Sequence, residues 1–250
     1  MRCCVVGAGL TGLALCVDLL EKNYTVTLVD DGNVLINTFS SELLLGIPEK
    51  NQALQALLDL MTTVAPTCFK KIQEGYIVDV AHYLKRLFDW CKHKGCLFEK
   101  NRSLESFDLY FFTTPLALIP LYTVKTQRAI VQLKKKPPLP VIKKHYLFDD
   151  GKQCVLGQTF EKTFENTLPD LNVVQKQLIE TSAFEVEQVL GIEVALRSYH
   201  KSYQPLSLQL NHNTYFLGAM GSNELLQHAY FSRKMVANID TKQKLALQGG

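Results

Sequence analysis

Three glycines near the start of the chain, Gly7, Gly9 and Gly12, have the spacing GxGxxG. They lie between an apolar run at 2–7, which predicts a buried parallel strand, and an amphipathic segment at 10–22, which predicts a helix. In a strand–turn–helix unit of this kind the first glycine permits the tight turn. The second lets the backbone approach a pyrophosphate, and the third lets helix and strand pack closely. The free amide groups at the helix start then face the phosphates.

An acidic residue follows the next predicted strand. Residues 24–30 form that strand, and Asp30 ends it 18 positions after Gly12. A carboxylate at this place accepts hydrogen bonds from a ribose hydroxyl. The pattern predicts a dinucleotide site made by Gly7, Gly9, Leu10, Thr11, Gly12, Asp30 and Asp31. By itself the motif fits NAD and FAD equally.

Composition narrows the class of protein. The chain has 250 residues, 47% of them hydrophobic and 20% charged, which is typical of a globular protein. A net charge of +3 is too small to indicate nucleic-acid binding by itself. No apolar run has the length of a membrane span and no signal peptide is recognisable, so we expect a cytoplasmic protein. Seven scattered cysteines without a CxxC pair predict reduced thiols, and Cys91, His93 and Cys96 lack the second ligand pair of a zinc site.

The order of the remaining elements predicts an α/β protein with an inserted sheet. Strands are expected at 107–113, at 121–133 with one face exposed, as a hairpin at 144–149 and 152–158, and near 192–197 and 213–217. Helices are expected at 50–63, 79–92, near 172–181 and at 222–239. We therefore expect a split dinucleotide domain that carries an antiparallel sheet for the substrate.

Several short blocks resemble the FAD-dependent D-amino-acid-oxidase family. They are Phe39-Ser40-Ser41, Gly46-Ile47-Pro48, Gly75 to Asp79, Tyr122 to Val131, Gly157 to Glu161, Val194 to Arg197 and Tyr215 to Ser222. The last block is most similar to the oxidase domain of the bifunctional enzymes that make 5-methylaminomethyl-2-thiouridine in tRNA. The resemblance extends over most of the chain and favours FAD as the cofactor.

The resemblance implies a Rossmann-type FAD-binding domain (GR2-like) with an inserted antiparallel substrate sheet, shortened relative to the family. The FAD-binding domain would comprise residues 1–48, 70–118 and 205–245, and the substrate domain residues 49–69 and 119–204.

Individual roles follow from the same resemblance. Arg197 is expected to pair with the substrate carboxylate and Tyr146 to line the substrate pocket, which makes these two the catalytic candidates. Ser222 and Asn223 are expected to cap the last helix, whose start would face the flavin. Further cofactor contacts are expected from Ser40, Ser41, Gly218, Met220, Gly221, Ser222, Asn223, Glu224 and Leu225.

Two positions depart from the family pattern. Thr113-Thr114-Pro115 stands where the family has a turn ending in glycine, and Glu224 stands where the tRNA-modifying branch has glycine. Proline removes an N–H and adds bulk where glycine permits close contact, and a carboxylate at position 224 would oppose the anionic reduced flavin. Either change predicts weak flavin binding, a different substrate or lost catalysis.

Three functions are compatible with these patterns. The first is an FAD-dependent oxidation of a C–N bond in a small amino acid or N-substituted glycine. The second is an FAD-dependent modification of a wobble uridine in tRNA, for which only the lysine run Lys134 to Lys136 offers an RNA contact. The third is a non-catalytic flavin-binding protein. The sequence predicts a small amine as partner and no membrane, and it predicts no oligomeric state.

Overall fold

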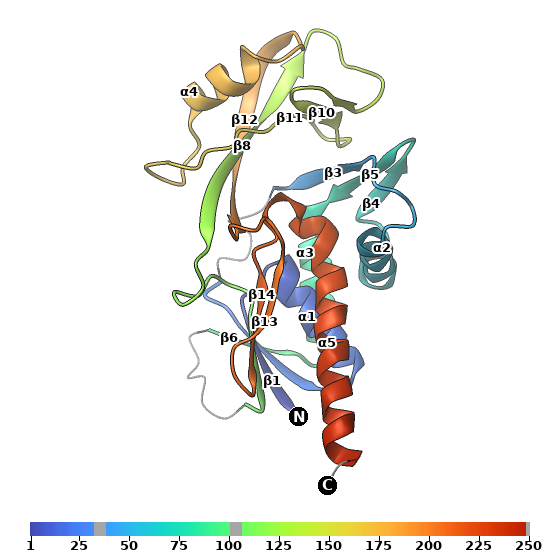
Figure 1. The fold of residues 1–250 in the computed structure, drawn as a ribbon. Helices are drawn as coiled ribbons and strands as arrows, with labels where there is room; N and C mark the ends of the chain where they lie inside the picture. Colours follow the sequence, from blue (N-terminus) through green and yellow to red (C-terminus); the bar gives the residue numbers. More distant parts are fainter. Residues whose placement is uncertain (33–38, 101–106, 249–250) are drawn as a thin grey trace.

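The computed structural model describes residues 1–32, 39–100 and 107–248, with side chains as far as residue 241. These residues form a mainly parallel sheet at one end of the molecule, an antiparallel sheet at the other end and a small third sheet between them (Figure 1). The predicted α/β fold with a second, antiparallel sheet is confirmed. Among the described residues, no helix combines the length and the hydropathy needed to cross a membrane.

The first sheet has the strand order β13-β14-β7-β1-β2-β6. All neighbours in it are parallel except β13, which runs antiparallel to β14 at the edge. Helices cover this sheet, so the middle residues of β1 and β2 are buried, the polar Thr27 among them. Its strands are β1 (Arg2–Val6), β2 (Thr25–Val29), β6 (Leu97–Glu99), β7 (Leu109–Phe112), β13 (Leu206–Gln209) and β14 (Thr214–Gly218).

Four helices pack together beside the first sheet. They are α1 (Leu10–Glu21), α2 (Gln52–Val64), α3 (Val80–His93) and α5 (Glu224–Gln248). The long α5 runs beside α1 and α2 to the C-terminus (Figure 1). It begins at Glu224, two residues later than predicted, because Gly221–Asn223 form a 3-10 turn. The start predicted near Ser222 is therefore two residues early, whereas Asn223, the other residue expected to cap the helix, directly precedes α5.

The second sheet is antiparallel, with the order β12-β8-β11-β10-β9. Its strands are β8 (Tyr122–Leu133), β9 (Val141–Ile142), β10 (Tyr146–Asp149), β11 (Cys154–Gly157) and β12 (Val186–Tyr199). The hairpin predicted around Gly151 is confirmed. The half-exposed character predicted for β8 is wrong. Ala129 and Val131 pack under α4 (Leu171–Val174) and the π-helical turn Gln175–Ile179, whereas Ile130 packs on the opposite face.

The third sheet has the order β3-β5-β4 and connects the two others. Its strands are β3 (Ser41–Leu45), β4 (Phe69–Ile72) and β5 (Gly75–Asp79). Ile77 of β5 packs against Ile130 of the second sheet, whereas Leu57 and Met61 of α2 belong to the core of the first sheet. The domain boundaries given above stay a prediction, and α2, which that prediction assigns to the substrate domain, packs with the helices of the first sheet.

Two titratable side chains are buried where α5 meets α1 and α3. The His228 ring contacts the Tyr83 hydroxyl at 3.0 Å, and its Nδ1 lies 2.8 Å from the Leu225 carbonyl oxygen. Burial lowers the pKa of His228 to about 4. Asp18 of α1 accepts a hydrogen bond from the Ser232 hydroxyl, and burial raises its pKa to about 7. The two groups therefore have opposite effects on stability between pH 4 and 6.5.

We expect Asp18→Asn to reveal the effect of His228. In that pH range the unfolded chain protonates His228 more readily than the folded chain, so stability falls as the pH is lowered. The loss between pH 6.5 and pH 4 should be roughly 3 kcal/mol. In the wild-type chain Asp18 offsets this loss of stability. Because the pKa of Asp18 is raised in the folded chain, the folded chain binds this proton more tightly than the unfolded chain, and stability rises as the pH is lowered through the same range. Urea unfolding of both chains at several pH values measures the difference.

The same experiment has a control above neutral pH. Asp18→Asn should be more stable than the wild type at pH 8, because the wild type then holds a buried carboxylate in its charged form. Equal stability of the two chains at pH 8 would show that burying the charged carboxylate of Asp18 does not destabilise the wild type.

Candidate functional site

A cavity of about 400 Å³ lies at the carboxyl ends of β1, β7 and β14, beside the start of α1. Ligands of open α/β sheets bind at this edge. We call it the glycine cavity. Ten of the predicted cofactor residues line it, namely Gly7, Gly9, Leu10, Thr11, Asp30, Asp31, Gly218, Met220, Gly221 and Glu224.

The three glycines of the motif have three distinct roles in the structure. Gly7 has a φ of +106°, which side chains disfavour, so the turn after β1 requires glycine. A Cβ on Gly12 would lie 1.8 Å from the Gly7 carbonyl oxygen, so Gly12 allows α1 to pack on the turn. A Cβ on Gly9 would meet no atom within 4 Å. Gly9 is therefore not required for packing, and its free face borders the glycine cavity.

Asp30 stabilises the turn that carries these glycines. One carboxylate oxygen accepts a hydrogen bond of 2.7 Å from the Ala8 amide, and the other accepts one of 2.7 Å from the Gly32 amide. Its predicted position at the end of the second strand is confirmed, and its side chain lines the cavity. Each oxygen retains a lone pair for a further donor, so Asp30 can also accept a hydrogen bond from a ligand hydroxyl.

The two departures from the family pattern both lie at the cavity. Pro115 lines the cavity. The Thr113 hydroxyl is a hydrogen-bond donor to the carbonyl oxygens of Val6 and Gly7, at 3.0 and 3.1 Å. Glu224, the first residue of α5, accepts a hydrogen bond of 3.1 Å from the Thr11 hydroxyl in the first turn of α1. A carboxylate therefore lies beside the helix start at which anions bind.

The charged side chains that line the glycine cavity are all acidic. Asp30, Asp31 and Glu224 are its charged lining residues, and no lysine, arginine or histidine of the described chain is among them. The start of α1 offers the compensating dipole. Its first helical hydrogen bond is donated by the Leu13 amide to the Gly9 carbonyl, so the preceding amides lie at the positive end of the helix.

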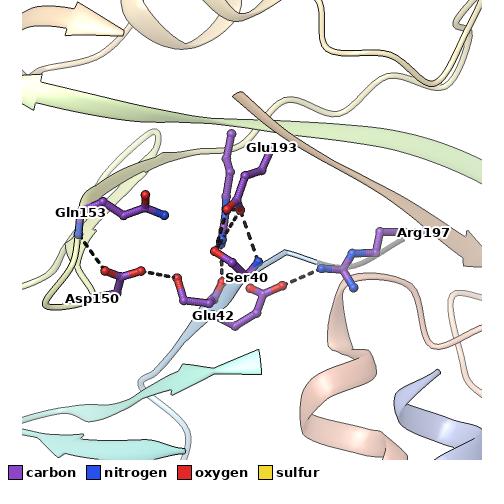
Figure 2. A network of polar contacts seen from close by, with 8 residues as sticks. Ser40, Glu42, Asp150, Gln153, Glu193 and Arg197 are labelled. Atoms are coloured by element: carbon purple, nitrogen blue, oxygen red, sulfur yellow. Dashed lines mark hydrogen bonds and ion pairs between the residues drawn. The ribbon is translucent and has the colours of Figure 1, made fainter. Parts of the chain in front are cut away.

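Besides Gly12, five of the predicted cofactor residues do not line the glycine cavity. Ser222 and Asn223 form the 3-10 turn beside it, and Leu225 is buried in the core. Ser40 and Ser41 lie at the start of β3, in a second polar group that Figure 2 shows. Contact of these five residues with a cofactor stays a prediction.

A buried arginine organises this second group. Arg128 of β8 is fully buried, and its Nη2 lies 2.5 Å from Glu193 of β12, the residue opposite it in the strand pairing. The guanidinium also donates to the Ser41 carbonyl oxygen and stands over the Phe39 ring at 4.2 Å. The Ser40 hydroxyl completes the ion pair by donating to Glu193 at 2.6 Å.

One catalytic candidate, Arg197, belongs to this group, and the other, Tyr146, is within its electrostatic range. Arg197 is buried, and its Nη2 lies 2.6 Å from an Oε1 of Glu42 in β3, as Figure 2 shows. The Tyr146 hydroxyl is buried within the electrostatic reach of Glu42, Arg128 and Arg197, and burial raises its pKa. It makes no hydrogen bond with the described residues. We call Glu42, Arg128, Tyr146, Glu193 and Arg197 the arginine cluster.

The arginine cluster and the glycine cavity lie on opposite faces of β12. Side chains alternate along a strand. Leu196 and Ser198 line the glycine cavity, so Arg197 between them points to the other face, toward Glu42. The role predicted for Arg197 as a carboxylate clamp stays a prediction, and in the structure the Nη2 of Arg197 is paired with Glu42.

Sequence reasoning missed Arg128, Glu193 and Glu42. The signal available was weak, because Arg128 follows the polar residues Lys125, Thr126 and Gln127, and only the apolar residues 129–131 after it indicate that its charge is buried and requires a partner. Its partner lies 65 residues away in the chain, and only the strand register brings the two together.

Two sequence blocks discussed above, the one at 157–161 and the lysine run at 134–136, make contacts within the protein. Thr159 and Glu161 hydrogen-bond Gln127, whereas Lys134 and Lys136 are paired with Glu185 and Asp149.

No protein-family model and no curated protein matches the chain. Solved structures do match it over nearly its whole length. Glycine oxidase from Bacillus cereus ATCC 14579 has a TM-score of 0.72 at 12% identity, over 96% of this chain and 95% of that chain. L-proline dehydrogenase from P. horikoshii has a TM-score of 0.72 at 12% identity, over 97% and 93%. L-amino acid deaminase from Proteus vulgaris has a TM-score of 0.70 at 9% identity, over 94% and 92%. This chain therefore has the fold of these amino-acid oxidases, dehydrogenases and deaminases.

Proposed function

We propose that the glycine cavity binds FAD and that the protein is an oxidoreductase acting on a C–N bond of a small amine. The observation that carries the proposal is the convergence of the GxGxxG turn, Asp30 and the Gly218–Gly221 turn on one cavity. Structural similarity to glycine oxidase and L-amino acid deaminase supports the reaction class, since those proteins share the fold.

The shape of the turn fits a dinucleotide. Gly7 and Gly12 are required by the backbone, whereas Gly9 leaves space where a pyrophosphate would lie against the first turn of α1. The amides of Leu10 and Thr11 would bind the phosphates, and Asp30 would accept a hydrogen bond from the adenosine ribose.

The other side of the cavity fits the reactive ring. Leu121, Leu196 and Phe216 provide apolar lining, and the Gly218–Gly221 turn brings backbone close to the cavity. When bound, FAD would supply the group that accepts a hydride from the carbon next to the amine nitrogen. The residues of this chain would hold the substrate and exclude water from the cavity.

Replacing Glu224 by glutamine should strengthen FAD binding. The carboxylate lies beside the first turn of α1, where it opposes the charge of a diphosphate. Glutamine keeps the acceptor for the Thr11 hydroxyl and removes the charge. We expect the Kd for FAD to fall roughly three- to tenfold at low salt. The difference should shrink in high salt, because counterions screen the repulsion.

A titration of FAD fluorescence at two salt concentrations measures this effect. Glu193→Gln is not a suitable control, because Glu193 pairs with the buried Arg128. Glu185→Gln is suitable, since Glu185 is exposed, pairs with Lys134 and does not line the cavity. An unchanged Kd in Glu224→Gln would place the diphosphate away from this carboxylate.

The function itself is tested by anaerobic reduction of the FAD-reconstituted protein. Small primary and secondary amines should bleach the flavin absorption, whereas alcohols of the same carbon skeleton should not. If no amine reduces a protein that binds FAD stoichiometrically, the amine-oxidising function is refuted and the cofactor assignment is unaffected.

A further inference from the structure

We propose that Glu42 is a built-in carboxylate ligand of Arg197, and that the amine which this protein oxidises carries no free carboxylate. The second half rests on the proposed function. The first half concerns the chain alone and holds whether or not the protein turns over.

The contact between Glu42 and Arg197 is the starting observation. Arg197 is 6% exposed and its Nη2 lies 2.6 Å from Glu42 Oε1. A planar guanidinium pairs with a carboxylate through this kind of short, charge-assisted bond. An external carboxylate would have to displace Glu42, leaving it partly buried without its partner, or bind a guanidinium whose charge Glu42 already neutralises. The ion pair within the chain therefore competes with any ligand carboxylate.

No other cation of the arginine cluster is free to take its place. Arg128 already pairs with Glu193 and donates to the backbone of Ser41. The cluster thus contains two guanidinium groups and two carboxylates, and its net charge is zero. The unsatisfied donor in it is the neutral Tyr146 hydroxyl.

The glycine cavity offers no replacement for Arg197. Its charged lining residues are the carboxylates Asp30, Asp31 and Glu224, and the described lining contains no cationic side chain. Leu196 and Ser198 are the β12 side chains that face it, because Arg197 lies on the other face. A substrate carboxylate in this cavity would therefore find no cationic side chain of the described lining to pair with.

Chemical rescue tests the first half. Glu42→Ala leaves a buried guanidinium without its carboxylate and opens a space beside it. We expect a lower Tm for this variant, and added sodium propionate should recover most of the loss, whereas propionamide and sodium chloride should not. The wild-type chain should not respond to propionate. Glu185→Ala is the matched control. It also removes a carboxylate from an ion pair, but the cation left behind, Lys134, is exposed to water, so we expect no stabilisation by propionate.

Two further variants exclude a general effect on folding. Glu42→Ala combined with Arg197→Met should be insensitive to propionate, because no buried charge remains to be paired. Tyr146→Phe in the Glu42→Ala background should weaken the rescue, because the orphan hydroxyl is then missing as a second donor. Propionate stabilising the wild type as much as Glu42→Ala, or failing to stabilise Glu42→Ala, would overturn the assignment of Glu42.

A matched pair of substrates tests the second half. N-methylglycine and N-methylglycinamide have the same skeleton and differ in the carboxylate. The FAD-reconstituted wild type should be reduced by the amide at least about tenfold faster, which corresponds to about 1.4 kcal/mol. Glu42→Gln should narrow this ratio, because Arg197 is then no longer neutralised. Faster reduction by the acid in the wild type would refute this substrate class. If neither compound reduces a protein that shows propionate rescue, the proposed function fails and the assignment of Glu42 stands.

Discussion

Gly9→Ala should fold like the wild type and bind FAD at least about ten- to hundredfold more weakly. A Cβ at this position would meet no protein atom within 4 Å, and its φ of −72° suits any residue. The added methyl group would project into the glycine cavity at the helix start, where the pyrophosphate is expected. It would therefore obstruct the ligand and leave the fold undisturbed.

Gly12→Ala is the matched comparison. Its Cβ would lie 1.8 Å from the Gly7 carbonyl oxygen, so α1 would have to move away from the turn. This variant should lose stability as well as FAD affinity. Thermal unfolding together with an FAD titration separates the two cases. Equal loss of Tm in both variants, or full FAD affinity in Gly9→Ala, would contradict the assignment of Gly9 to the ligand.

Arg128→Met should be the most destabilising of these substitutions. It leaves Glu193 partly buried without its counter-ion and removes the bond to the Ser41 carbonyl oxygen. Removing one partner of a buried ion pair costs about 3–5 kcal/mol. For a chain of this size we expect a fall in Tm of roughly 10 °C, measured by circular dichroism.

The double variant Arg128→Met with Glu193→Leu distinguishes the charge from the packing. Replacing both partners by apolar side chains removes the unpaired charge, so most of the lost Tm should return. No recovery in the double variant would show that the hydrogen bonds to Ser40 and Ser41, rather than the ion pair, carry the stability of this contact.

The sequence was most informative where local rules decide the structure. Gly7 and Gly12 have backbone requirements that only glycine meets, so the turn and the start of α1 could be predicted from their spacing. The position of Asp30 at the end of β2 followed from the same unit. Local rules also placed the hairpin at Gly151, because its turn chemistry is encoded in adjacent residues.

Prediction was least informative where register between distant strands decides. The pairing of Arg128 with Glu193 depends on the alignment of β8 and β12, which no short motif contains. The face to which Arg197 points depends on where β12 begins and on which layers cover it, and the sequence identified Arg197 without its partner Glu42. The burial of β8 on both faces likewise arises from α4 on one face and β5 on the other, which come from other parts of the chain.

The most direct test of the central claim is an equilibrium titration of the wild-type chain with FAD, with NAD⁺ as the comparison. We expect saturable binding of one FAD per chain, a shifted flavin absorption band and no competition by NAD⁺ at the same concentrations. A chain that is folded by circular dichroism but leaves FAD fluorescence and absorption unchanged would contradict the assignment of the glycine cavity as an FAD site.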